Sequence, residues 1–98
     1  MQDEEWRALP SLPHILVSDR GNVFNKTKAR MLKQTVGPND SRTVYITDRQ
    51  IGVHRLVWET FSGPLPKGKH LRHIDGDHAN NAFDNLEIQT RSRARLYD

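Results

Sequence analysis

The first half of the chain consists of short runs in which apolar and polar residues alternate, separated by clusters of turn-forming residues. Alternation with a period of two places the apolar side chains of a strand on one face, whereas Gly, Pro, Asn and Asp favour reversals of the backbone. We therefore predict a small antiparallel sheet with one polar face. Its strands are expected at residues 14–18, 23–25, 31–36, 43–47 and 51–53, with turns at residues 19–22, 37–40 and 48–49.

The period of the pattern then changes. Val53, Val57 and Phe61 recur at four-residue intervals, which predicts a short amphipathic helix over residues 54–61 that packs on the sheet. The Ser-Gly-Pro-Leu-Pro segment at residues 62–66 ends this helix. The remaining chain is expected to form a strand at residues 70–74, a polar loop at 75–85, a strand at 86–89, and a terminal helix that Thr90 caps and that runs through Leu96.

A chain of 98 residues is long enough for one compact unit with a single core. The absence of cysteine excludes disulfides and zinc sites built from cysteine. The acidic start lacks the basic and apolar regions of a secretory signal, and no run approaches the roughly 18 apolar residues of a membrane span. We therefore expect a cytoplasmic protein without a membrane partner.

Basic residues are clustered, although the formal net charge is only +3. Such clusters are often no more than solvated surface. Three of them in so short a chain favour a polyanionic partner, because neutralised phosphates release their counterions. The candidate DNA-binding residues are Lys26, Lys28, Arg30, Lys67, Lys69, Arg72, Arg91, Arg93 and Arg95.

The segment from residue 73 to residue 81 concentrates imidazole, carboxylate and amide side chains. His73 is a candidate general base, because a neutral imidazole at a strand end can take a proton from water. Asn85 is a candidate for a structural role, since its amide can pin the loop or the histidine itself. Loops of this composition are also typical of plain turns. The segment lacks the glycine spacing and final glutamate of a calcium loop, and the five histidines lack the HExxH spacing of zinc enzymes.

Several motifs, taken in order, resemble the HNH homing-type endonucleases of phages and mobile introns. They are Val53-His54-Arg55-Leu56-Val57 with Phe61, Arg72-His73-Ile74-Asp75-Gly76-Asp77, Asn80-Asn81, Asn85-Leu86-Glu87 and Thr90. The N-terminal stretch is similar to the small DNA-binding module that often precedes such nuclease cores. Its matching residues are Glu5-Trp6, Val17-Ser18, Gly21-Asn22-Val23 and Leu32-Lys33.

The resemblance implies an α+β fold. A β-rich DNA-binding module over residues 1–52, a small antiparallel sheet, would join a ββα-metal (His-Me finger) nuclease core over residues 53–98 in one compact unit. It also implies that the protein nicks or cleaves double-stranded DNA with Mg²⁺ or Mn²⁺, in the host cytoplasm if a phage encodes it. His73 would be the general base, and Asn85 would be the asparagine that holds the loop between the two strands.

Two positions depart from the nicking members of the family. Arg72 replaces a metal-binding aspartate before the base, and Ala94 replaces a metal-binding asparagine in the terminal helix. Mg²⁺ normally needs one or two protein oxygens beyond the substrate phosphates, so we expect the ion to bind weakly. The candidate substitute ligands are Asp75, Asp77 and His70. Alternatively, Arg72 contacts the scissile phosphate and stabilises its charge directly.

The expected function is metal-assisted hydrolysis of DNA by an HNH endonuclease, in an active, impaired or engineered form. The alternative is a DNA-binding or regulatory module that keeps the scaffold without catalysis, which the two replaced ligands favour. A protein-interaction domain is a third interpretation, because a fold does not dictate a function.

Overall fold

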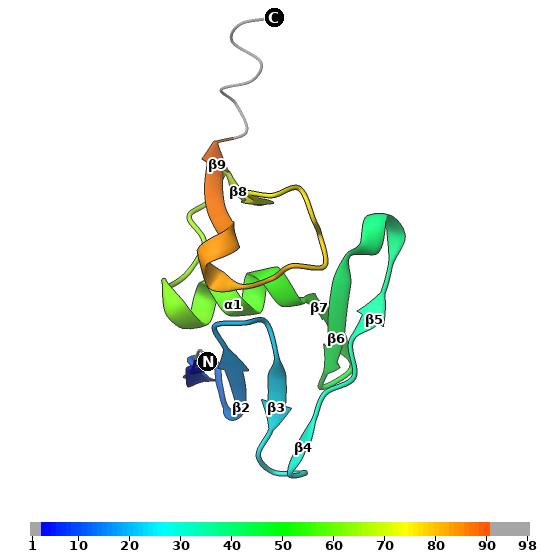
Figure 1. Ribbon diagram of the computed structural model, residues 1–98. Coiled ribbons are helices and arrows are strands. Elements are labelled where there is room, and N and C mark those ends of the chain that lie inside the picture. The colour runs from blue at the N-terminus through cyan, green and yellow to red at the C-terminus, as the bar shows by residue number, and fades with distance from the viewer. Residues whose placement is uncertain (1–2, 91–98) are drawn as a thin grey trace, which may run out of the picture.

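The computed structural model describes residues 3–90, which form three antiparallel sheets and an α-helix, an α+β fold (Figure 1). The sheets have the strand orders β1-β2-β3-β4, β5-β6-β7 and β8-β9. The elements are β1 (Trp6–Leu9), β2 (Leu12–Ser18), β3 (Val23–Asn25), β4 (Arg30–Met31), β5 (Thr35–Val36), the 3-10 turn η1 (Pro38–Asp40), β6 (Arg42–Ile46), β7 (Arg49–Gly52), α1 (Val53–Phe61), β8 (Lys69–His73), the 3-10 turn η2 (Phe83–Asn85) and β9 (Leu86–Thr90).

The first sheet contains the predicted strands β2 and β3, joined by the predicted turn at residues 19–22. Alternation in β2 buries Ile15 and Val17 in the core. β1 is an additional strand that the pattern did not indicate, because Trp-Arg-Ala-Leu does not alternate. It joins the sheet through backbone pairing with β2, in which Trp6 lies opposite Ser18.

The prediction of a single strand at residues 31–36 is wrong. Met31 ends β4 in the first sheet, and Thr35 begins β5 in the second sheet. Between them, the Leu32 amide donates to the Val23 carbonyl at 2.8 Å, so the chain is still tied to the first sheet just before it crosses to the second. Met31 is exposed, and the run therefore has no continuous buried face to hold it in one sheet. The one sheet that we expected is two sheets.

β6 and β7 form a hairpin in which Ile46 pairs with Arg49. Thr47 and Asp48 make its turn, one residue earlier than predicted, with φ values of 49° and 65°. Positive φ at both central positions matches the twist of a tight hairpin. β7 ends before the predicted boundary because Val53 already begins the helix.

α1 lies between the first sheet and the β8–β9 hairpin (Figure 1). The predicted apolar stripe is confirmed: Val53 and Val57 are buried, and Phe61 packs against the core. The rings of Trp58 and Phe61 both contact the ring of Phe83, at centroid distances of 5.5 and 5.7 Å, and so hold η2 against the helix. The core combines residues from the first two sheets, the helix and β9: Leu9, Ile15, Val17, Val23, Val44, Ile46, Val53, Leu56, Val57 and Leu86.

The predicted strands β8 and β9 pair from Lys69 opposite Thr90 to His73 opposite Leu86. The loop between them passes back towards the turn of the first sheet (Figure 1), where the Phe83 amide donates to the Asp19 carbonyl at 2.7 Å. This hydrogen bond fixes the loop to the β2–β3 turn. The terminal helix predicted after Thr90 lies outside the described residues, together with Arg91, Arg93, Ala94 and Arg95.

Candidate active site

His73 is the last residue of β8 and faces the interior side of that strand. Successive side chains of a strand point to opposite faces, and accordingly Leu71 and His73 are partly buried while His70 and Arg72 are exposed. His73 also lines an open pocket of about 490 Å³, together with Arg72 and His78. The imidazole is therefore partly buried by its neighbours and still reaches the surface.

Asn81 makes the polar contact to this imidazole. Its Oδ1 lies 2.7 Å from His73 Nε2, and Asn81 is only 4% exposed. An amide oxygen accepts hydrogen bonds and cannot donate them, so Nε2 is the nitrogen that carries hydrogen. In a neutral ring, Nδ1 then keeps its lone pair and can accept a proton. Sequence reasoning missed this role of Asn81, and the signal that pointed towards it is the Asn80-Asn81 pair within the motif.

Asn85 makes hydrogen bonds to two other residues of the loop, Asp75 and Asn80. Its Nδ2 donates to Asp75 Oδ1 at 3.0 Å and to the Asn80 carbonyl at 2.9 Å, while its Oδ1 accepts from the Asp75 amide at 3.2 Å. These bonds join the two ends of the loop. Of the two contacts considered for Asn85, to the loop or to the imidazole, these are to the loop, and the imidazole is bonded by Asn81.

Asp75 is the centre of the loop's hydrogen bonding. Its carboxylate accepts from Asn80 Nδ2 at 3.0 Å, from the Asp77 amide at 2.8 Å and from Asn85 Nδ2 at 3.0 Å. These donors, Asn80 first, lower the pKa of Asp75 to about 2, because each stabilises the charged form. Asp77 Oδ1 in turn accepts from the Ala79 amide at 3.0 Å. Both carboxylates therefore serve the loop's own backbone and side chains.

Two further histidines flank His73. The ring of His54, on α1, lies 5.5 Å from that of His73, and the ring of His78, in the loop, lies 5.1 Å from it. Burial lowers the pKa of His54 to about 4, with smaller contributions from the positive charges of His73, Arg55 and His78. His54 is therefore neutral at physiological pH and adds no charge beside His73. His78 is exposed, and its ring lies beside that of His73.

The structure does not gather the three substitute metal ligands. His70 is exposed on the face of β8 opposite His73 and lines a different pocket, with His54. Asp75 and Asp77 are engaged in the loop, as described above. Within residues 3–90, no three His, Cys, Asp or Glu side chains are grouped so that they could hold a metal ion. The described donors thus do not fit an ion site on their own.

The candidate DNA-binding residues are spread over the molecule. Arg72 Nε pairs with Glu87 Oε2 at 2.8 Å across the β8–β9 hairpin. Lys28 and Arg30 line a cleft between the first two sheets, near Tyr45. This cleft involves the β3–β4 turn, at the opposite end of the molecule from the β8–β9 hairpin (Figure 1). Lys26 lies in the same turn. Lys69 begins β8, and Lys67 lies just before it. The remaining candidates lie outside the described residues: Arg91, Arg93 and Arg95.

The segment that builds this site also matches a known family. A family model described as HNH endonuclease matches residues 52–96, which include α1, His73 and both strands of the hairpin. Residues 52–96 of this chain are thus similar to the HNH endonucleases. The suspected resemblance is thereby confirmed.

Two relatives also match this chain. It is 31% identical over 86 residues to the SPbeta prophage-derived putative HNH homing endonuclease YosQ of Bacillus subtilis (strain 168), an alignment that covers 83% of this chain and 50% of the relative. A stretch of 35 residues is 51% identical to Protein 3.8 of Escherichia phage T7 and covers 36% of this chain and 29% of that protein. The chain thus spans half or less of the length of these relatives.

A solved structure shows the same fold. The HNH homing endonuclease I-HmuI, in a structure described as DNA binding and cleavage by that enzyme, matches with a TM-score of 0.80 and 24% identity over 95% of this chain and 56% of that chain. The match confirms the predicted α+β fold class.

Among residues 3–90, none of the helical segments is both long and apolar enough to cross a membrane.

Proposed function

We propose that this chain nicks or cleaves double-stranded DNA by hydrolysis of a phosphodiester bond, with His73 as the general base. The observation that carries the proposal is the position of His73. Its imidazole lies at a strand end and lines an open pocket, with Nε2 bonded to Asn81. The family and the DNA binding and cleavage described for I-HmuI support this choice of substrate.

The chemistry follows from the state of the ring. A neutral imidazole takes a proton from water while the water oxygen forms a bond to phosphorus, and the phosphorus–oxygen bond to the leaving group breaks. The leaving oxygen then takes a proton from solvent. The neutral His54 beside His73 matters here, because a positive charge at 5.5 Å would disfavour the imidazolium that forms. Basic side chains hold the DNA backbone on either side.

The proposal also concerns the binding of a divalent cation. The family resemblance implies Mg²⁺ or Mn²⁺, which would neutralise charge on the phosphate when bound. The described residues do not fit such an ion on their own, and Ala94 stands where nicking members have a metal-binding asparagine. We therefore expect this chain to bind the ion weakly and Ala94→Asn to bind it more tightly.

A plasmid assay tests the proposal. Supercoiled plasmid is incubated with the protein and with Mg²⁺ or Mn²⁺, and the relaxed and linear forms are measured on a gel. We expect His73→Ala to abolish nicking, whereas Gln50→Ala, a change of an exposed residue on β7 in the second sheet, retains it. Nicking that survives in His73→Ala would refute the role of His73, provided that circular dichroism shows both variants folded.

A DNA-binding module without catalysis is the second candidate, and the contacts of the site favour it in one respect. The Asp75 carboxylate is held by the loop, and Arg72 is paired with Glu87. This candidate predicts that the chain shifts duplex DNA on a gel with steep salt dependence but does not nick it. Nicking by Ala94→Asn alone would identify the chain as a disabled nuclease.

A further inference from the structure

The β2–β3 turn of the first sheet packs directly against Asn81. Gly21 in this turn is buried and has a φ of +93°. A Cβ atom added at Gly21 would lie 3.1 Å from Asn81 Cβ and 3.2 Å from the Asn81 carbonyl oxygen. The backbone of the turn therefore approaches Asn81 as closely as a residue without a side chain allows.

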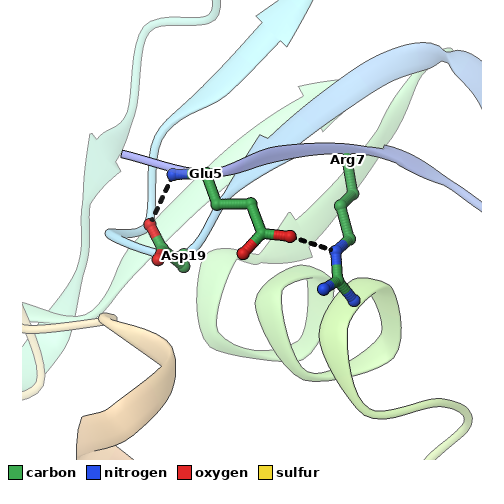
Figure 2. A network of polar contacts seen from close by, with 3 residues as sticks. All are labelled: Glu5, Arg7 and Asp19. Atoms are coloured by element: carbon green, nitrogen blue, oxygen red, sulfur yellow. Dashed lines mark hydrogen bonds and ion pairs between the residues drawn. The ribbon is translucent and has the colours of Figure 1, made fainter. Parts of the chain in front are cut away.

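The turn is itself held in a fixed shape. Ser18 Oγ accepts from the amides of Arg20 and Asn22 at 3.2 and 3.0 Å, and Gln34 Nε2 donates to the Gly21 carbonyl at 2.8 Å. Figure 2 shows the Glu5 amide donating to Asp19 Oδ1, at 3.1 Å. These bonds tie the turn to its own strand and to neighbouring segments.

The same turn also holds the chain just after Asn81. The Asp19 amide donates to the Glu5 carbonyl at 2.9 Å, and the Asp19 carbonyl accepts from the Phe83 amide at 2.7 Å. Asn81 is thus fixed by the close approach of Gly21 on one side and by the Phe83 bond two residues later. The turn therefore leaves the Asn81 side chain little freedom to leave His73.

We propose that Asn81 is a positioning residue that fixes the His73 ring with hydrogen on Nε2 and Nδ1 free for the water, and that Gly21 holds Asn81 in place. A continuous series of contacts supports this: the turn packs on Asn81, and Asn81 Oδ1 bonds His73 Nε2. The first sheet is then a structural part of the active site as well as a candidate DNA-binding module. The effect of Asn81 on catalysis rests on the proposed function, whereas the orientation of the His73 ring does not depend on that function.

NMR tests the orientation without any assay of activity. In protein labelled with ¹⁵N, the couplings of the His73 ring show which nitrogen carries hydrogen at a pH where the ring is neutral. We expect hydrogen on Nε2, with its exchange slowed by the bond to Asn81. Asn81→Ala should lose this protection, and Asn81→Asp, which keeps an oxygen acceptor, should retain it. A wild-type ring with hydrogen on Nδ1 would overturn the inference, even if the protein nicks DNA.

Glycine variants test the role of the turn. Gly21→Ala and Gly63→Ala both place a side chain at a positive φ, but only Gly21→Ala meets Asn81, since nothing lies within 4 Å of the Cβ position at Gly63. We expect Gly21→Ala, but not Gly63→Ala, to disturb the His73 ring signals and to lower nicking by about tenfold, the effect of one lost hydrogen bond. Equal effects of the two variants would refute the role of Gly21.

The two proposals fail separately. Loss of nicking in every protein, wild type included, together with a protected Nε2 hydrogen, would remove the proposed function and leave the role of Asn81 intact. If Asn81→Ala does not fold, the wild-type ring and Gly21→Ala still decide the question, because Gly21→Ala disturbs the contact without opening a cavity.

Discussion

The partly buried His54 should make the protein less stable as the pH falls. Its pKa is lowered from 6.5 to about 4 in the folded state, mainly by burial. Between these two values the unfolded chain binds a proton at this residue and the folded chain does not. Stability is therefore full above pH 6.5, decreases as the pH falls through this window, and is unaffected further by His54 below about pH 4.

The size of the effect follows from the shift. The lowering of the His54 pKa corresponds to at most about 3 kcal/mol in the free energy of unfolding. Solvent screening around the partly exposed ring reduces this to roughly 1–2 kcal/mol. His54→Gln removes the titrating group and keeps a polar side chain of similar reach. The free energy of unfolding in urea, followed by the fluorescence of the neighbouring Trp58, should then vary less with pH in the variant than in the wild type.

The comparison between the two proteins isolates His54, because the carboxylates titrate in both. The relevant interval is pH 6.5 to 5, above the ordinary range of Asp and Glu. If His54→Gln and the wild type lose the same stability over this interval, the lowered pKa and the packing that causes it are refuted.

Three further predictions follow from the described contacts. Asp75→Ala should open the loop and increase its cleavage in limited proteolysis, and the wild-type loop should remain protected until the pH falls below 3.8 towards the pKa of about 2; equal cleavage of both proteins would contradict its role. Val57→Ala, at a fully buried site, should cost about 2–3 kcal/mol in urea unfolding, because two methyl groups leave the core; a loss below about 1 kcal/mol would contradict this packing. Replacing Lys28 and Arg30 with alanine should weaken DNA binding and reduce the slope of log affinity against log salt by about two, measured by fluorescence anisotropy; an unchanged slope would exclude the cleft from the DNA interface.

The periodicity of apolar residues predicted those elements that have one buried face and one more exposed face. β2 and α1 each have a buried face, so their apolar residues recur at the spacing of a strand and of a helix. β1 and the break at residues 31–36 depend instead on backbone pairing and on exposed side chains such as Met31. Each of these segments buries too few side chains for a pattern of apolar residues to reveal it: in β1 only Leu9 is fully buried.

The site was predictable in part for a similar reason. His73 is identified by its chemistry and by its place at the end of a strand, both of which can be inferred from sequence. Which amide reaches its ring depends on how the loop closes, and that closure is set by Asp75 and by the approach of Gly21 from a distant part of the chain. Asn80, Asn81 and Asn85 are chemically alike, so residue type alone does not distinguish them.

The location of α1 sets a rule for engineering chimeric nucleases. Val53, Leu56 and Val57 are no more than 2% exposed, in a core built largely from the first two sheets. A fragment cut at residue 53 would return these side chains to water, at roughly 1.5–3 kcal/mol each. The HNH segment, residues 52–96, is therefore not expected to keep its fold when it is moved alone into another protein. A fusion to a foreign DNA reader needs to graft the helix together with both preceding sheets.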